Sequence, residues 1–331
     1  MSAAQSPLFG RKVVVTGGAG FIGSHTIDLL IDRGCREVVA VDDMVRGRPE
    51  NLLAAMARGP VRLVTGDIRD NRLMRTVLAG AELVLHMAAL RITQCAVEPR
   101  RAMEVMVDAT YDLLESCVVL GVGKVVMASS ASIYGLAETF PTPESHHPWG
   151  NRTLYGVAKT FGEGILRVFN EMHGLDYVAL RYFNAYGPRM DMHGRYTEVL
   201  IRWMERIEGG LPPVIFGDGS QTMDMVHGCD IARANVLAAE SQATDVVLNV
   251  GTGHETSLYR LARLLAEVMG RPDLHPVHEP ERSVNPVPRR LAATDAASAA
   301  IGFTAAISVR EGLGDLVAWW RRNRVPVASA L

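Results

Sequence analysis

The sequence predicts an α/β fold in which a doubly wound parallel sheet is joined to a smaller second lobe. Short runs rich in Val and Leu alternate with helical stretches through the first half of the chain. Such alternation is typical of a parallel sheet covered by helices on both faces. A glycine-rich turn follows the first run, as it does where a phosphate-binding loop opens a helix. After Gly187-Pro188 the alternation becomes irregular, which indicates a change of architecture.

Strands are predicted from short apolar runs bounded by polar or turn residues. These runs are Val13–Thr16, Glu37–Val41, Val61–Thr65, Leu83–His86, Lys124–Ala128, Tyr177–Arg181 and Val246–Val250. Helices are predicted where apolar residues recur at three- and four-residue spacing. They are Ile27–Arg33, Met103–Leu120, Leu154–Asn170 and Asp230–Glu240, with a short helix inside the Ala-rich segment Leu291–Ala306.

The order of these elements predicts two domains, the second of them discontinuous. The first comprises residues 1–182 and about 225–252, and the second comprises about 183–224 and 253–331. The second domain is expected to cap the carboxyl ends of the parallel strands, because ligands bind there in sheets of this kind.

Composition excludes several classes of protein. The formal net charge is −2 and the Lys and Arg residues are scattered, so there is no electrostatic footprint for nucleic acid. Residues 1–11 have no apolar core of signal-peptide length, and no apolar run is long enough to span a membrane. We therefore expect a cytoplasmic protein that makes no contact with a membrane.

Cysteine and histidine spacing argues against a metal site. Four widely separated cysteines show no C-x-x-C pattern and are expected to be reduced thiols. Two histidine pairs, His146-His147 and His275 with His278, lack accompanying Cys or carboxylate ligands at suitable spacing.

The glycine turn predicts a dinucleotide site. Gly17 permits a tight turn, Gly20 permits close approach to a diphosphate, and Gly23 permits the helix to pack near the strand. Asp42 ends the second strand, nineteen residues after Gly23. A carboxylate there accepts hydrogen bonds from the adenosine ribose and repels a 2′-phosphate. These features together favour NAD over NADP, the alternative being a purely structural turn.

Tyr155 and Lys159 form a Y-x-x-x-K pair in a predicted helix. Residues four apart share one helix face, and a nearby ammonium stabilises phenolate over phenol. Tyr155 is therefore predicted to titrate nearer neutrality and to act as a general base. The alternative is a solvated lysine beside a packed tyrosine.

The preceding strand supplies the context that favours catalysis. It runs into Ser129-Ser130-Ala131-Ser132, and a catalytic hydroxyl is expected at the carboxyl end of a strand. Ser130 is predicted to bridge a sugar hydroxyl and Tyr155, the alternative being a turn serine that satisfies local backbone groups.

With these motifs in order, the sequence resembles the extended short-chain dehydrogenases/reductases that act on nucleotide sugars, which have a Rossmann-like fold. Among them it is most similar to the UDP-glucose 4-epimerases. The resemblance covers nearly the whole chain. It rests on TGGAGFIG at 16–23, Asp42, Gly66-Asp67-Ile68, His86-Met87-Ala88-Ala89, SSASIYG at 129–135, Tyr155 with Lys159, RYFNAYGPR at 181–189 and FGDGSQ at 216–221.

The resemblance implies roles for individual residues. Asp67 and Ile68 bracket the adenine, Arg91 lies where a cofactor-contacting lysine is usual, and Lys159 also holds the nicotinamide ribose. The implied NAD-binding set is Gly17, Gly20, Phe21, Ile22, Gly23, Asp42, Asp67, Ile68, Ala88, Ala89, Arg91, Tyr155 and Lys159. The candidate substrate-binding residues are Ser130, Ser132, Asn184, Arg189, Arg282 and Arg289.

The two residues after Ser130 indicate which of the reactions found among such enzymes this chain is expected to catalyse. Dehydratases carry an Asp-Glu pair there and decarboxylases a Glu at the second position, whereas this chain has Ala131 and Ser132. The resemblance therefore implies an epimerase acting at carbon 4 of a nucleotide-diphosphate sugar, most simply a UDP-sugar. Tyr155 would remove a hydroxyl proton while NAD takes hydride, and hydride would return to the other face of a transient keto-sugar. A keto-sugar reductase or dehydrogenase and a catalytically silent NAD(H)-binding protein are the alternatives.

Two departures concern substrate binding. Met223 stands where an arginine usually pairs with the nucleotide diphosphate, and Met106 stands where an asparagine is usual. Arg282 or Arg289 is a candidate replacement for the missing charge, because a diphosphate needs cationic partners. Surface arginines in a Pro-rich loop are the alternative. The resemblance also implies a homodimer formed through the predicted helices Met103–Leu120 and Leu154–Asn170.

Overall fold

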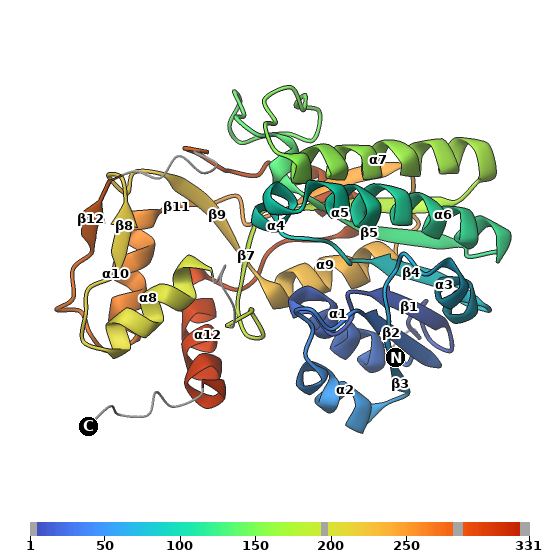
Figure 1. The fold of residues 1–331 in the computed structure, drawn as a ribbon, viewed down its shortest axis with the longest axis horizontal. Coiled ribbons are helices and arrows are strands. Elements are labelled where there is room, and N and C mark those ends of the chain that lie inside the picture. Colours follow the sequence, from blue (N-terminus) through green and yellow to red (C-terminus); the bar gives the residue numbers. More distant parts are fainter. Residues whose placement is uncertain (1–4, 193–197, 281–286, 325–331) are drawn as a thin grey trace.

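The computed structural model describes residues 5–192, 198–280 and 287–324. Within these ranges, seven parallel strands form the central sheet in the order β10-β6-β5-β4-β1-β2-β3 (Figure 1). The strands are β1 Lys12–Thr16, β2 Glu37–Asp42, β3 Val61–Thr65, β4 Leu83–His86, β5 Lys124–Ser130, β6 Asp176–Tyr182 and β10 Val246–Val250. All seven predicted strands are confirmed, and β5 continues two residues further to Ser130.

Helices cover both faces of this sheet, as its apolar strands require. Val13 and Val15 of β1 pack with helices on one face, and Val14 packs with those on the other. The first set comprises α1 Phe21–Asp32, α2 Leu53–Arg58 after the 3₁₀ turn η1 Pro49–Leu52, α9 Gly228–Glu240 and α11 Asp295–Ile301. The second set comprises α3 Asn71–Leu78, α4 Ile92–Val97, α5 Pro99–Met103, α6 Ala109–Val119 and α7 Leu154–His173. This alternation of side chains explains why the strands are apolar throughout.

The helix predicted over Met103–Leu120 is not continuous. A π-helical turn, η2 Glu104–Asp108, separates α5 from α6. The Thr110 hydroxyl donates to the Met106 carbonyl across this turn at 3.0 Å. A π-turn inserts a residue into the helical ladder, so the apolar spacing alone could not show the interruption.

The helix that carries Tyr155 and Lys159 has well-defined ends. The Thr153 side chain caps α7 by accepting from the Gly156 N–H at 3.1 Å. The helix ends at Gly174, whose φ of 65° suits glycine. A 3₁₀ turn, η3 Ala131–Ile133, follows β5 and precedes this helix in the chain.

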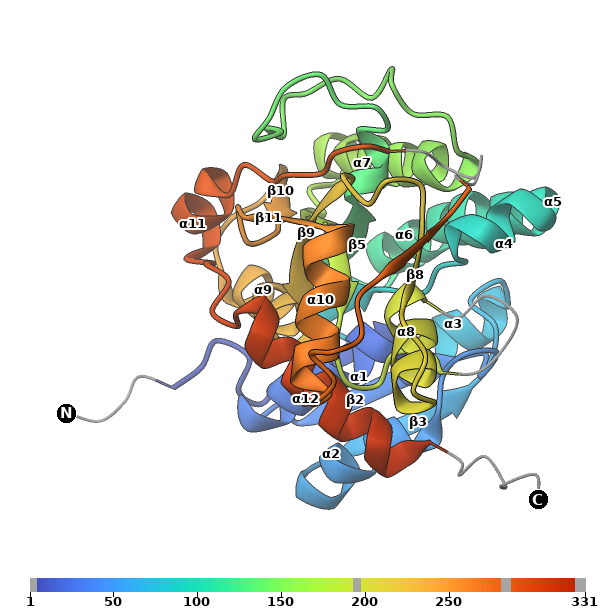
Figure 2. The same cartoon turned by 90° about the vertical axis from the view of Figure 1, so that its left-hand side faces the viewer.

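A second lobe lies beside the central sheet, on the left of Figure 1 and toward the viewer in Figure 2. It contains the sheet β11-β9-β7 and the strand pair β12-β8. Its elements are β7 Asn184–Tyr186, α8 Val199–Glu208, β8 Val214–Phe216, β9 Thr222–His227, β11 Glu255–Ser257, α10 Leu258–Val268, β12 Val277–Glu279 and α12 Val309–Asn323. Trp203, Leu261 and Leu316 pack together in its core.

Packing refines the domain boundaries predicted from the sequence. β9 pairs within the small sheet, so the chain rejoins the large sheet's helices only with α9, at residue 228. Ala292, Ile301 and Phe303 pack in the core beneath the large sheet, although the prediction placed residues 253–331 in the second domain. The two-domain division with these adjusted limits stays a proposal.

Candidate active site

A cavity of about 1180 Å³ lies at the carboxyl ends of the central strands and is lined by both lobes. Most of the predicted site residues line it. They are Gly17, Gly20, Phe21, Ile22, Gly23, Asp42, Asp67, Ile68, Ala88, Ala89, Arg91, Ser130, Ser132, Tyr155, Lys159 and Arg189. Asn184 and Arg289 are not part of this lining, and Arg282 lies outside the described residues.

The glycine turn has the shape of a diphosphate cradle. Gly17 has a φ of 68°, and a Cβ there would lie 3.0 Å from the Ala88 nitrogen. A Cβ at Gly23 would overlap the Gly17 carbonyl oxygen, so only glycine lets α1 begin this close to β1. No side chain caps the N-terminus of α1, which leaves its first N–H groups available to phosphate oxygens. The turn therefore fits the diphosphate of NAD.

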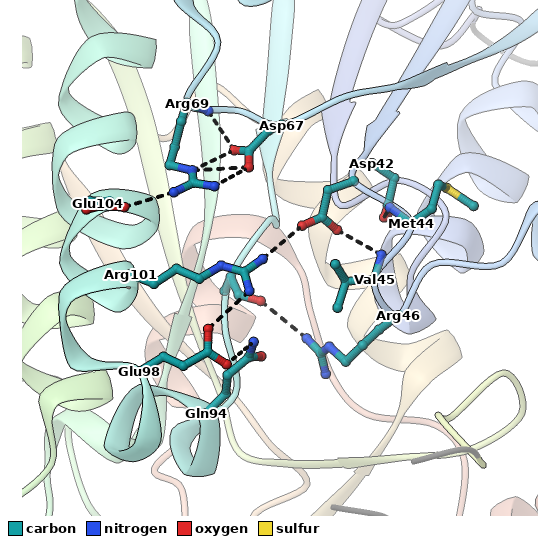
Figure 3. Close-up of polar contacts among 12 residues, drawn as sticks. Asp42, Met44, Val45, Arg46, Asp67, Arg69, Gln94, Glu98, Arg101 and Glu104 are labelled. Atoms are coloured by element: carbon teal, nitrogen blue, oxygen red, sulfur yellow. Dashed lines mark hydrogen bonds and ion pairs between the residues drawn. The ribbon is translucent and has the colours of Figure 1, made fainter. Parts of the chain in front are cut away.

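Asp42 lies where the adenosine ribose of a dinucleotide is expected. Its carboxylate is buried and accepts from the Ala19 and Met44 N–H groups at 3.0 Å each. Burial raises the pKa of Asp42, and these two hydrogen bonds oppose the rise. After the neighbouring strand β3, Asp67 lines the same cavity and forms an ion pair with Arg69 at 2.8 Å (Figure 3). This hydrogen bond is the main reason that the pKa of Asp67 is lowered.

Tyr155, Ser130 and Lys159 meet at the inner end of the cavity. Ser130 lies close enough to Tyr155 for its hydroxyl to lower the pKa of the phenol. The Ser130 hydroxyl also accepts from the Ser132 N–H at 3.1 Å. The Lys159 ammonium donates to the Ala128 carbonyl at 2.6 Å and lies 5.8 Å from the centre of the Tyr155 ring. The structure thus brings together all three predicted catalytic side chains.

The predicted lowering of the Tyr155 pKa is wrong for the protein alone. Burial raises the pKa of Tyr155 above its ordinary value, and the Ser130 hydrogen bond opposes this only in part. Burial also lowers the pKa of Lys159 to about 8, and its ammonium is directed to the Ala128 carbonyl. The cation is therefore less effective than the spacing suggests, and desolvation dominates.

A buried ion pair between β6 and α7 lies next to the catalytic side chains. Sequence analysis did not predict it. Arg181 of β6 binds Glu163 of α7 through two hydrogen bonds of 2.9 and 2.6 Å. Ser129, beside Ser130, donates to the same carboxylate at 2.5 Å. Arg181 also donates to the Tyr134 hydroxyl at 2.8 Å. The spacing of Glu163 one turn after Lys159 is the only sequence signal for this network.

The predicted substrate residues are dispersed. Arg189 lines the cavity, but its guanidinium is 2.7 Å from the Asp28 carboxylate of α1. Arg289 is exposed and pairs with Glu255 at 2.7 Å. The Asn184 amide donates to the Met223 sulfur at 3.4 Å, so the residue in place of the usual arginine is a neighbour of Asn184.

The lining residues Arg202 and Arg206 carry no sequence motif, whereas Phe216 begins the FGDGSQ segment. Arg202, Arg206 and Phe216 line the cavity from the second lobe. Arg290 is close enough to Tyr155 for its charge to lower the pKa of the phenol, while burial lowers the pKa of Arg290 to about 10. The sequence alone does not reveal which of the adjacent residues Arg289 and Arg290 lies near Tyr155.

Among the described residues no group of three or more His, Cys, Asp or Glu side chains could hold a metal ion. No helix in the described ranges is long and apolar enough to cross a membrane.

Comparison with known proteins identifies relatives over the whole fold. A model of the NAD dependent epimerase/dehydratase family matches residues 13–251, more than half of the chain. A UDP-glucose 4-epimerase of Mycolicibacterium smegmatis is 34% identical over 315 residues, covering 94% of this chain and 99% of that protein.

Two solved structures share this fold closely. The UDP-N-acetylglucosamine 4-epimerase of Methanobrevibacter ruminantium, in complex with UDP-N-acetylmuramic acid, superposes with a TM-score of 0.89 at 33% identity. The match covers 96% of this chain and all of that one. The UDP-glucose 4-epimerase of Thermotoga maritima with UDP-glucose gives a TM-score of 0.87 at 35% identity over 94% and 99% of the two chains.

Proposed function

Because this chain belongs to the NAD-dependent epimerase/dehydratase family, we propose that it interconverts two nucleotide-diphosphate sugars that differ in configuration at carbon 4. The observation that carries the proposal is the meeting of Tyr155, Ser130 and Lys159 at the wall of one cavity. Proton transfer at a sugar hydroxyl requires such a group within hydrogen-bond reach.

The cofactor is NAD, which when bound supplies a reversible acceptor for the hydrogen on the reacting sugar carbon. The glycine turn and the open N-terminus of α1 would hold its diphosphate, and Asp42 its adenosine ribose. Lys159 would hold the ribose at the opposite end of the cavity.

The chain's own residues would then move one proton. The Tyr155 oxygen accepts the proton of the sugar 4-hydroxyl and later returns it, while Ser130 hydrogen-bonds both oxygens and orients them. Lys159 stabilises the phenolate through its charge. Ala131 and Ser132 stand beside this group, and neither offers the carboxyl group that water elimination or decarboxylation would need.

We propose a UDP-sugar as substrate, supported by the names of the relatives with matching folds. The second lobe supplies an aromatic ring at Phe216 and guanidinium groups at Arg202 and Arg206 to the same cavity. A nucleoside diphosphate needs both kinds of partner. Asn184, Ser132 and Arg189 remain proposed substrate contacts, whereas Arg289 would first have to leave Glu255.

We also propose a homodimer, supported by an exposed apolar stripe on α7. Val157, Phe161, Val168 and Met172 are all exposed, and their spacing places them on one face of the helix. Tyr111 of α6 is exposed beside it and contacts Phe169 edge to face. A contiguous apolar face of this kind marks an interaction surface.

A cytoplasmic location is part of the proposal. The four cysteines are free thiols, as is usual where the compartment is reducing.

The deciding experiment incubates purified protein, without added cofactor, with UDP-, GDP-, ADP-, CDP- and dTDP-sugars. Products are followed by NMR and mass spectrometry. A stereoisomer of unchanged mass would support the epimerase and identify its substrate. A requirement for stoichiometric cofactor would favour the reductase or dehydrogenase, and bound NAD without any turnover would favour the silent binder.

A further inference from the structure

The sheet order defines the path that the cofactor must take. β1 lies between β2 and β4, so the glycine turn after β1 lies between Asp42 at the end of β2 and Ala88 after β4. A dinucleotide with its adenosine at Asp42 and its nicotinamide near Tyr155 therefore crosses the end of β1. Its diphosphate passes over the glycine turn at this point.

The Arg46 side chain also extends from the β2 side of the cavity to the β4 side, past the end of β1. It belongs to the loop after β2, lines the cavity, and donates from Nη2 to the Ala89 carbonyl at 3.2 Å (Figure 3). Among the described residues this is its one hydrogen bond, and the side chain is otherwise exposed within the cleft. An exposed arginine held by a single hydrogen bond to a carbonyl gains little stability from it, and four of its five N–H donors remain for another partner.

The Arg46 loop is anchored at its other end. Asp43 accepts from the Val45 N–H at 3.1 Å and lies 3.9 Å from the Arg101 guanidinium of α5 (Figure 3). Arg101 is itself held by Glu98 at 3.1 Å. The loop therefore lies within ion-pair distance of α5 at Asp43, and Arg46 extends from it across the cleft.

Arg46 ends in a cluster of charges that both lobes supply. Arg91 lies 3.3 Å from Asp191 and 3.7 Å from Glu198, and all three line the cavity. The walls of the cleft partly desolvate the accessible Arg46 side chain and lower its pKa, and the charge of Arg91 lowers it further, while Asp191 and Glu198 raise it. Two guanidinium groups near one another are unfavourable unless anions lie close to them, and a bound diphosphate would add negative charge to that of the two carboxylates.

We infer that Arg46 is a cofactor-binding residue whose guanidinium holds the diphosphate of NAD from the open side of the cleft. The N–H groups at the start of α1 bind the same diphosphate from the opposite side. A planar guanidinium matches phosphate oxygens well, and Arg46 with Arg91 supplies the positive charge. The contact keeps NAD on the protein between turnovers, which suits a reaction that returns its cofactor unchanged. The inference depends on NAD binding and is independent of the sugar.

An alternative ligand for Arg46 is the 2′-phosphate of NADP, because Arg46 follows the strand that ends at the ribose site. The geometry favours the diphosphate. Arg46 donates to the Ala89 carbonyl after β4, and the buried Asp42 carboxylate would repel a 2′-phosphate.

The test measures cofactor retention and not activity. Wild-type protein and the variants R46A, R46Q and R48A are loaded with NAD and passed through gel filtration. Bound nucleotide is then quantified by chromatography over time after dilution. Arg48 belongs to the same loop, is exposed and does not line the cavity, so R48A is the control with the same change of charge.

R46A is expected to release NAD at least about tenfold faster than wild type, because a hydrogen bond to a charged group is lost. R46Q keeps a donor for the Ala89 carbonyl but lacks the charge, so its release should match that of R46A, while R48A should match wild type. Wild-type retention in R46A would overturn the inference, as would wild-type retention in R46Q. Weaker binding of NADP with unchanged binding of NAD would instead assign Arg46 to the 2′-phosphate. Circular dichroism of the four proteins separates misfolding from loss of the contact.

Discussion

The Lys159 ammonium lies one helical turn from Tyr155, 5.8 Å from the centre of its ring, and donates its 2.6 Å hydrogen bond to Ala128 instead. We therefore propose that Lys159 acts on Tyr155 through its charge and not through a hydrogen bond to the phenol. Burial raises the pKa of Tyr155 and lowers that of Lys159, because desolvation disfavours the charged form of each group.

Replacing the Tyr155 hydroxyl tests the proton transfer. Y155F should lower kcat by roughly 10²- to 10⁴-fold, because general acid–base catalysis contributes about that much. The NAD content after purification should stay near that of wild type, since the glycine turn and Asp42 remain. Both are measured by NMR of the product sugars and by chromatography of released nucleotide.

A matched control is Y259F, because Tyr259 is exposed on α10 and lies outside the cavity lining. Near-wild-type turnover by Y155F would contradict the proposed role of Tyr155.

The ionisation of Lys159 should appear in the pH profile. The pKa of Lys159 is lowered to about 8 by burial, so its ammonium is present below that pH and is lost as the pH rises through it. The neutral amine no longer favours the phenolate, and kcat should decline above about pH 8. Rates from pH 6 to 10 at saturating substrate measure this.

The variant K159R keeps its charge throughout this range because arginine is not deprotonated. Its rate should be lower at neutral pH but should lack the decline above pH 8. The same decline in both proteins would assign it to another group.

The ion pair between Glu163 and Arg181 should contribute strongly to stability. E163Q leaves the buried Arg181 charge without its carboxylate. Removing one partner of such a pair lowers the free energy of unfolding by about 3–5 kcal/mol. Chemical denaturation with NAD at a fixed concentration gives the difference, since bound cofactor itself stabilises the fold.

R310A is the control for that experiment. Arg310 and Glu267 form a pair at 2.6 Å whose side chains are both exposed, and such pairs contribute about 0–1 kcal/mol. Equal losses in the two variants would show that burial does not matter at Glu163.

The apolar stripe on α7 should be the dimer interface. F161E places a charge in the middle of the stripe, where burying it would be costly, and should convert the dimer to a monomer. Size-exclusion chromatography with light scattering measures the mass. L211E introduces the same charge at an exposed apolar residue of the second lobe and should leave the mass unchanged. A monomeric wild type, or a dimeric F161E, would rule out this interface.

The sequence predicts the central sheet well because its strands are buried on both faces. Residues such as Val13, Val14 and Val15 are apolar for that reason, and no longer-range information is needed to recognise them. The carboxyl-end site is predictable for the same reason, since Gly17 directly follows β1 while Asp42 and Ser130 are the last residues of their strands.

Other features depend on contacts that no local pattern contains. The π-turn at Glu104–Asp108 interrupts an apolar spacing that is compatible with a continuous helix. The direction of the Tyr155 pKa depends on burial by both lobes. Arg46 belongs to a loop without any motif, and the FGDGSQ segment does not reveal which way Phe216 faces. Only the folded chain shows that both residues share a cavity with Tyr155.

Gly20 and Gly23 of the first turn are required for different reasons, one for ligand binding and the other for the fold itself. A side chain at Gly23 would collide with the Gly17 carbonyl whether or not a nucleotide is bound, whereas a Cβ at Gly20 would meet only that oxygen, at 3.1 Å. A descendant that had lost its cofactor would thus be free to change Gly20 while Gly23 persisted. Retention of Gly23 in a relative therefore indicates only that the fold is shared. Retention of Gly20 indicates that a ligand still binds at the turn.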